Sequence, residues 1–218
     1  MALEHLKYQN IFEFPILLIA GPSGAGKGTL ITNINALQPH YEKSVSCTTR
    51  PLDPEQEQEG VDYYSISKEE FADKLSRNEF AETNSYMQGK GNNYGTPWSE
   101  FERISLLGKT PALDIDINGI LQLVDKKLSR KSTFRLFLDV NEDEQERRLI
   151  ARARKGDCAS SIAKRVSFAR EERKQYFFHK QNDPQLFDHY INTSNAIPGV
   201  VANDVLNMLI ARRRIFTP

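Results

Sequence analysis

The 218-residue chain lacks the features that mark membrane, disulfide-rich and nucleic-acid-binding proteins. Its two cysteines, Cys47 and Cys158, have no Cys-x-x-Cys spacing, which favours reduced thiols over a metal site. The 29 Lys and Arg residues balance 29 Asp and Glu residues, so no overall basic field attracts nucleic acid or anionic lipid. The first ten residues contain charges and no apolar segment typical of a signal peptide, and the apolar run Ile16–Ala20 is far too short to span a bilayer. We therefore expect a soluble cytoplasmic protein without nucleic-acid or membrane partners.

The segment GPSGAGKGTL, residues 21–30, follows this apolar run and matches a phosphate-binding loop with one displacement. Gly21, Gly26 and Lys27 fit the pattern G-x-x-x-x-G-K-[ST], but the next residue is Gly28 and the hydroxyl comes one place later, at Thr29. An apolar strand, a glycine-rich turn and a helical pattern are the context that this motif requires. In such a loop, backbone N–H groups and a helix N-terminus converge on phosphate oxygens, and the lysine reaches the β and γ groups. The sequence therefore predicts a triphosphate site formed by Gly21, Pro22, Ser23, Gly24, Ala25, Gly26, Lys27, Gly28 and Thr29.

Apolar runs and helical patterns alternate along most of the chain. Strands are predicted at residues 16–20, 111–117, 133–140 and, more weakly, 189–193. Helical patterns cover residues 28–37, 117–128, 142–154 and 161–180. This alternation predicts an α/β fold with a parallel, doubly wound sheet.

Residues 44–100 break this rhythm, because their apolar segments are short, β-rich and separated by turns. Ser67 and Glu70 form a capping box before a short helix that carries Phe71 and Leu75 on one face. The polar, acidic segment 50–60 is predicted to be a surface loop. We expect an N-terminal extension (1–14), a core (15–43 and 101–218) and an inserted small α+β lobe (44–100).

Five further segments, read together with the loop, carry a resemblance to a known family. They are SVSCTTR (44–50), GVDYY (60–64), NEFAET (78–83), NNYGTP (92–97) and LDIDING (113–119). In this order they resemble guanylate kinases. The resemblance implies a P-loop NTPase core, a GMP-binding lobe and a helical lid at about residues 148–165. The implied reaction is the Mg²⁺-dependent transfer of a phosphoryl group from ATP to GMP in purine metabolism. We expect a monomer or a homodimer. A kinase for another phosphorylated acceptor and a non-catalytic guanylate-kinase-like binding module are the alternatives.

The resemblance also assigns residues to the acceptor nucleotide. Arg50, Tyr63 and Tyr94 would hold the GMP phosphate, since a guanidinium fork and two phenols suit a dianion. Glu82 would accept hydrogen bonds from the N1–H and amino group of guanine. The remaining base-reading positions are Ser46, Thr96 and Asp116.

Other charged residues match catalytic positions of the family. Asp114, which is expected to point the same way as Asp116 on a strand, would orient the Mg²⁺ shell with Thr29, largely through water. Lys27, Arg50 and Asp114 would act in catalysis together with the lid arginines Arg154 and Arg165. Arg152 would contact ATP. Besides Arg165, the family has further lid arginines upstream, and these correspond to Arg148 together with either Arg152 or Arg154.

The charge pattern of the basic segment 146–174, taken alone, allows two interpretations. It could be a solvated helix face or a nucleic-acid patch. The interleaved Glu146, Glu171 and Glu172 argue against the nucleic-acid patch.

The chain departs from the family pattern at three places near the acceptor. Asp53 stands where a second phosphate-binding arginine is expected, Asn118 replaces a glutamine, and the loop between Glu82 and Tyr94 is longer and contains Lys90. We expect either a weaker grip on the GMP phosphate or a replacement cation, for which Lys90 is the candidate.

Overall fold

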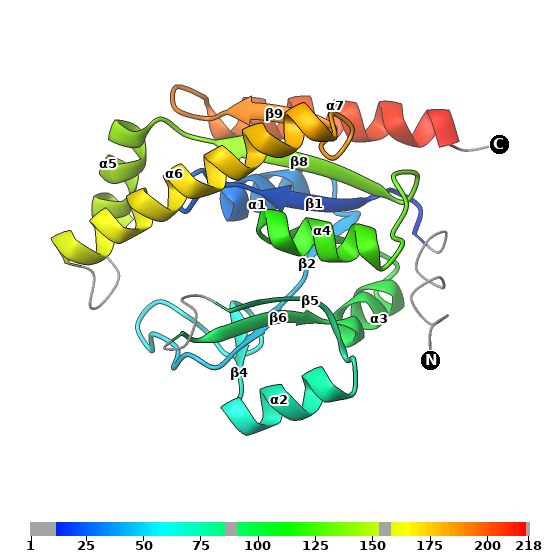
Figure 1. Cartoon of the computed structure of the whole chain (residues 1–218). Coiled ribbons are helices and arrows are strands. Elements are labelled where there is room, and N and C mark those ends of the chain that lie inside the picture. Colours follow the sequence, from blue (N-terminus) through cyan, green and yellow to red (C-terminus); the bar gives the residue numbers. More distant parts are fainter. Residues whose placement is uncertain (1–11, 86–90, 153–157, 217–218) are drawn as a thin grey trace.

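The computed structural model describes residues 12–85, 91–152 and 158–216, and it contains two sheets in separate layers (Figure 1). The larger sheet has five parallel strands in the order β2-β7-β1-β8-β9. Its strands are β1 (Ile16–Ala20), β2 (Tyr41–Lys43), β7 (Thr110–Asp114), β8 (Thr133–Asp139) and β9 (His189–Asn192). The predicted parallel, doubly wound α/β fold is therefore confirmed.

Helices cover both faces of this sheet. The helices are α1 (Lys27–Leu37), α4 (Ile117–Asp125), α5 (Glu142–Arg152), α6 (Ala159–Asn182) and α7 (Pro198–Phe216). Alternate residues of β1 explain the two layers, because Leu17 and Ile19 pack with α1 and α7 whereas Ile16 and Leu18 pack with α4. All of β1 is buried, as expected for a strand covered on both sides.

A smaller mixed sheet lies below the larger one in Figure 1. Its strand order is β4-β3-β6-β5, and it has its own apolar cluster around Cys47, Phe71 and Phe80. The strands are β3 (Ser46–Thr48), β4 (Tyr63–Ser65), β5 (Phe80–Ser85) and β6 (Asn93–Pro97). Helix α2 (Lys68–Ser76) starts where the capping box predicts, since the Ser67 hydroxyl accepts from the Glu70 N–H at 3.0 Å.

The structure corrects three local predictions. The strand predicted at 111–117 ends at Asp114, and Asp116 caps α4 instead of continuing the strand. Leu75 is half exposed, whereas Phe71 is buried, so α2 has a narrower apolar face than predicted. Helix α3 (Trp98–Leu106) was not predicted as a separate element. No helix among the described residues is long and apolar enough to cross a membrane.

Candidate active site

A cleft of about 1110 Å³ lies at the carboxyl ends of the parallel strands and reaches the smaller sheet. In open α/β sheets, ligands usually bind at this edge. The predicted site residues that line the cleft are Gly21, Ser23, Gly24, Ala25, Gly26, Lys27, Gly28, Thr29, Ser46, Arg50, Tyr63, Glu82, Tyr94, Asp114, Asp116, Arg152 and Arg165. Two other predicted site residues that the structure describes, Pro22 and Thr96, are not part of the cleft lining. Arg154 and Lys90 lie outside the described residues.

The glycine-rich loop begins directly after β1 and passes against β8. Gly21 has a φ of +139°, and a Cβ atom on it would lie 1.9 Å from the carbonyl oxygen of Leu138. No other residue type fits such a close approach without moving the backbone. Helix α1 then starts at Lys27, so its N-terminal N–H groups face the cleft.

Lys27 connects the loop with the end of β7. Its ammonium group donates to the carbonyl oxygens of Gly21 and Pro22 and lies 3.5 Å from a carboxylate oxygen of Asp114. Pro22 thus contributes through its backbone. A phosphate in the loop would offer this ammonium stronger acceptors than neutral carbonyls.

Helix α5 holds the loop from behind. The side-chain amide of Gln145, which is fully buried, donates to the carbonyl of Ser23 at 2.7 Å. Arg148 donates to the carbonyl of Gly24 at 3.1 Å and to that of Thr193 at 2.6 Å. Arg148, matched to a lid arginine, is therefore bonded to the loop in this structure.

Glu82 is a buried carboxylate at the other end of the cleft. One of its oxygens accepts from the Thr96 N–H at 3.0 Å and from the Thr96 hydroxyl at 2.6 Å. The second oxygen would lie 3.0 Å from a Cβ on Gly119, so the glycine at this position allows the carboxylate to pass close to α4. Burial, with Asp116 nearby, raises the pKa of Glu82 to about 7, although the Thr96 bonds lower it.

Asp116 lies beside Glu82 and is fixed on both oxygens. It accepts from the Gly119 N–H at 2.7 Å as the cap of α4, and from the Asn84 amide at 2.6 Å. Burial raises the pKa of its carboxyl. The Ser46 hydroxyl lies 3.0 Å from that of Thr96, so the base-reading residues predicted from the resemblance form one polar cluster.

The residues predicted to hold the acceptor phosphate lie together on the smaller sheet and the 50–60 loop. Arg50 donates through Nε to the Tyr94 hydroxyl at 3.2 Å, and its guanidinium lies 5.6 Å from the ring centre of Tyr63. Asp53 does not line the cleft; its carboxylate accepts from the Glu55 N–H in a tight turn.

Two further acidic residues, Glu172 and Glu57, line the cleft and were not predicted as site residues from the sequence. In the sequence, Glu172 served only as an argument against a nucleic-acid patch, but in the structure its carboxyl is influenced by the charge of Lys27. Burial, together with the charges of Asp116 and Asp114, raises its pKa to about 7, against the lowering effect of Lys27. The helical spacing from buried Ile162 through Arg165 and Ala169 to Glu172 could have placed it on the inner face.

Glu57 corrects the prediction that residues 50–60 are only a surface loop. Its side chain is 5% exposed and pairs with Arg50 at 2.8 Å. Nothing in the polar composition of this segment separates Glu57 from its exposed acidic neighbours.

The oxygen donors near Lys27 suit a magnesium ion that is shared with phosphates. Asp114 and Thr29 both line the cleft, and Asp114 is 37% exposed, so its carboxylate is accessible. Among the described residues, no group of three or more His, Cys, Asp and Glu could enclose a metal alone. Mg²⁺ typically keeps several waters and takes one or two carboxylates plus substrate phosphates, so these residues fit it.

Comparisons with known proteins identify the family. The family model described as guanylate kinase matches residues 14–193. The chain belongs to the guanylate kinase family. It is 38% identical to a guanylate kinase of Synechococcus sp. (strain JA-3-3Ab) over 159 residues, which are 72% of this chain and 69% of that protein. It is 33% identical to the guanylate kinase of Lactobacillus johnsonii over 204 residues, covering 89% of this chain and 96% of that one.

The fold is also similar to that of a solved guanylate kinase. The crystal structure of the Anaplasma phagocytophilum guanylate kinase superposes with a TM-score of 0.61 and 23% identity, covering 94% of this chain and 89% of that chain. At this identity the likeness supports the fold.

Proposed function

We propose that this chain uses ATP to phosphorylate GMP to GDP, and that both nucleotides bind in the cleft between the two sheets. The guanylate kinase family to which the chain belongs supports this activity. The observation that carries the assignment of the site is that one cleft joins the glycine-rich loop at Lys27 to the buried carboxylate of Glu82.

The loop end of the cleft would bind the triphosphate of ATP. Backbone N–H groups of residues 21–29 and the N-terminus of α1 provide hydrogen-bond donors, and Lys27 provides a positive charge. Arg152 and the Thr193–Ser194 segment line the same cleft and would contact the rest of ATP.

Glu82 would select guanine at the other end. Guanine offers two adjacent donors, N1–H and the amino group, to one carboxylate, whereas adenine has an acceptor at N1. A buried carboxylate that meets an acceptor stays unpaired, which costs free energy and rejects the wrong base. Ser46, Thr96 and Asp116 would support this recognition.

Phosphoryl transfer requires little covalent work from the protein, since positioning and charge stabilisation dominate. Arg50, Tyr63 and Tyr94 would hold the GMP phosphate as the attacking group. Lys27 and the lid arginines Arg165 and Arg154 would stabilise charge on the transferring oxygens. Asp114, with Thr29, would hold the water shell of Mg²⁺, which when bound would offset negative charge on the ATP phosphates.

The two sheets suggest that different segments of the chain bind ATP and GMP. We assign ATP binding to the core (15–43 and 101–218), GMP binding to the lobe (44–100) and closure to the lid (about 148–165), with residues 1–14 as an extension. The separate apolar cluster of the smaller sheet supports this division. The cytoplasmic location and a monomeric or homodimeric state remain predictions from the sequence.

A coupled assay for ADP release tests the proposal. GMP, dGMP, AMP, UMP and CMP are compared at equal concentration with ATP and Mg²⁺. We expect turnover with GMP and dGMP, and rates lower by about two orders of magnitude or more with the other nucleotides. Equal rates with AMP, or a preference for a pyrimidine nucleotide, would refute guanine selection.

A further inference from the structure

Each nitrogen of the Arg50 guanidinium donates to another group of the protein. Its Nε donates to the Tyr94 hydroxyl at 3.2 Å, its Nη2 to a carboxylate oxygen of Glu57 at 2.8 Å, and its Nη1 to the carbonyl of Pro51 at 2.8 Å. Nε and Nη2 form the side of a guanidinium that binds two oxygens of one phosphate in parallel. A phenol and a carboxylate thus occupy the edge that the acceptor phosphate needs.

Glu57 is held in this place by the turn that Asp53 caps. Its second carboxylate oxygen accepts from the Asp53 N–H at 2.9 Å, and the Glu57 N–H donates to the Asp53 carbonyl at 2.8 Å. The Asp53 carboxylate accepts from the Glu55 N–H and closes the turn. The residue that stands in place of a second arginine therefore helps to bring a carboxylate to the remaining one.

The charges at this end of the cleft oppose a dianion while Glu57 stays in place. Glu57 lines the cleft and pairs with Arg50 at 2.8 Å, so the guanidinium already faces a carboxylate before any phosphate arrives. The Glu57 side chain is 5% exposed, so its pair with Arg50 is poorly screened by solvent. A phosphate bound next to this carboxylate would be repelled at short range.

We propose that Glu57 is an internal competitor for the acceptor phosphate. Its carboxylate pairs with Arg50 in this structure and must release the guanidinium before the phosphate of GMP binds there. The apparent affinity for GMP is then the intrinsic affinity reduced by the fraction of protein in which Arg50 is released. This inference rests on the proposed role of Arg50 in binding GMP.

Ligands with and without a phosphate should differ in whether they compete with Glu57 for Arg50. A nucleotide with a phosphate dianion displaces the single negative charge of Glu57. Guanosine has the base but no phosphate, so it leaves the Arg50–Glu57 pair intact.

The experiment uses Glu57→Gln, which keeps the shape of the side chain and removes its charge. Glu55→Gln is the matched control, because Glu55 lies in the same turn and is exposed. The measurements are the KM and the dissociation constant for GMP, kcat, and the dissociation constant for guanosine. We expect Glu57→Gln to lower the KM and the dissociation constant for GMP about threefold to tenfold, as for loss of one competing ion pair. Guanosine binding should not change, kcat should stay within about twofold, and Glu55→Gln should match the parent.

Other outcomes would overturn the inference. A raised KM for GMP with a lowered kcat would mean that Glu57 positions Arg50 for the phosphate. No change would make Glu57 a spectator, and an equal gain in guanosine affinity would place its effect on the base. Glu57→Ala and thermal unfolding of both variants show whether a change reflects loss of the turn.

Arg50→Ala separates this inference from the proposed function. If this variant raises the KM for GMP more than about tenfold while Glu57→Gln does not lower it, the competitor role alone fails. If Arg50→Ala leaves the KM unchanged, the acceptor phosphate is bound elsewhere and the proposed assignment of the site fails.

Discussion

At the scale of single residues, Lys27 is the cation of the glycine-rich loop and lines the cleft. It contacts the carbonyls of Gly21 and Pro22 and lies near Asp114, and it would exchange these contacts for phosphate oxygens. Lys27→Ala should lower kcat by about 10²–10³, the usual cost of removing one preorganised electrostatic contact. Steady-state ADP release measures this effect.

The exposed Lys131 supplies the control for Lys27, since Lys131→Ala removes the same charge far from the cleft residues. Its kcat should match the parent. A Lys27→Ala turnover within a few-fold of the parent would mean that the glycine-rich loop is not the catalytic cradle.

Glu82 should make GMP binding sensitive to pH near neutrality. Burial raises its pKa to about 7, and only the ionised form accepts from both guanine donors. Lowering the pH through 7 protonates the carboxyl, so the KM for GMP should rise by about tenfold between pH 8 and pH 6. Glu82→Gln should have a higher KM at pH 8 and should lose this part of the pH dependence.

The Glu82→Gln variant is also the control for the phosphate of GMP, which itself titrates near pH 6. Any pH dependence of the KM for GMP that the parent and Glu82→Gln share belongs to the phosphate or to other groups such as Glu172. Identical profiles for the parent and the variant would show that Glu82 is not the titrating group that binds guanine.

The same carboxyl should affect stability without ligand. A raised pKa means that the folded protein binds more protons than the unfolded chain between about pH 4.5 and 7. Its ionisation therefore opposes folding, and this part of the stability is lost as the pH rises through 7.

At the scale of elements, the sequence predicted most strands and helices because apolar periodicity and capping are local. The run 16–20 is β1, and Ser67 caps α2 as the capping box requires. The strand predicted at 111–117 failed after Asp114, because the Asp116 side chain accepts from the Gly119 N–H and starts α4. Asp114 and Asp116 do line the same cleft. They reach it as the last residue of β7 and the N-cap of α4, and not as alternate residues of one strand.

Site residues on helices and loops were harder to predict than those in motifs. Glu172 could be found only by following the inner face of α6, and Glu57 is defined by a turn that forms around Asp53. Hydrogen bonds between distant segments decide which acidic side chain enters the cleft, and local composition does not contain that information.

The turn between β1 and α1 gives an element-scale prediction. A Cβ at Gly21 would overlap the Leu138 carbonyl on β8, and the positive φ adds about 1–3 kcal/mol of strain. Gly21→Ala should therefore lower the free energy of unfolding by at least about 3 kcal/mol, measured by urea denaturation.

Gly28→Ala is the matched comparison. Nothing lies within 4 Å of a Cβ at Gly28, which is in α1, so stability should stay the same or rise by no more than about 1 kcal/mol. Equal stability of the two variants would contradict the close packing of the loop against β8.

At the scale of the whole molecule, α4 joins the smaller sheet to the larger one. The Gln122 amide donates to the Thr83 carbonyl at 2.7 Å and accepts from the Thr83 N–H at 3.0 Å, as a neighbouring strand would. The Lys126 ammonium donates to the carbonyls of Phe80 and Ala81. These contacts place Glu82 of β5 over the N-terminal end of α4, and sequence patterns do not predict them, because the partners are about 40 residues apart.

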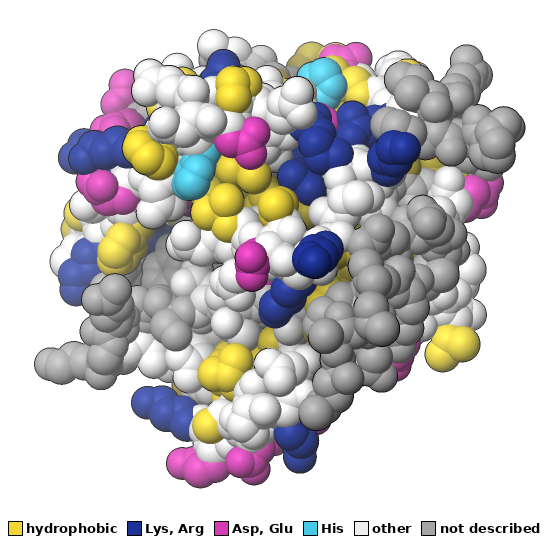
Figure 2. All heavy atoms as spheres, turned by 45° about the vertical axis from the view of Figure 1, so that its right-hand side comes forward, with side chains coloured by type: hydrophobic (Ala, Val, Ile, Leu, Met, Phe, Trp, Pro, Cys, Tyr) yellow, Lys and Arg dark blue, Asp and Glu magenta, His cyan; other side chains and the backbone are white. Residues whose placement is uncertain are grey.

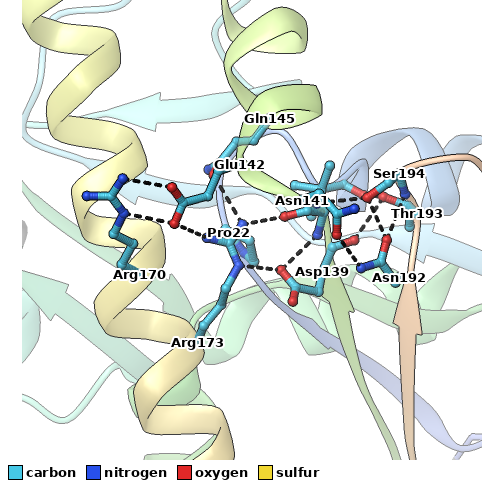
Figure 3. Close-up of polar contacts among 12 residues, drawn as sticks. Pro22, Asp139, Asn141, Glu142, Gln145, Arg170, Arg173, Asn192, Thr193 and Ser194 are labelled. Carbon is cyan, nitrogen blue, oxygen red and sulfur yellow. Dashed lines mark hydrogen bonds and ion pairs between the residues drawn. The ribbon is translucent and has the colours of Figure 1, made fainter.

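Helix α6 is tied to the core by two arginines with different surroundings (Figure 3). Arg173 lies 2.7 Å from Asp139 and 3.2 Å from Gln145, which in turn holds the glycine-rich loop. Arg170 lies 2.7 Å from Glu142 at the surface. The Arg173 contact thus connects α6 with the glycine-rich loop through buried groups. Figure 2 shows Lys and Arg side chains at the surface on one face of the molecule.

The burial of the two pairs predicts different costs for their loss. The Arg173 and Asp139 side chains are 15% and 8% exposed, whereas those of Arg170 and Glu142 are 58% and 41% exposed. Arg173→Ala should lower the free energy of unfolding by about 3 kcal/mol, because it leaves the buried Asp139 carboxylate without its cation. Arg170→Ala should cost less than about 1 kcal/mol, because solvent and salt already screen the exposed pair. Urea denaturation of both variants at low and high salt measures the difference. Equal costs, or a loss in Arg173→Ala that disappears at high salt, would show that α6 is not held to the core through Asp139.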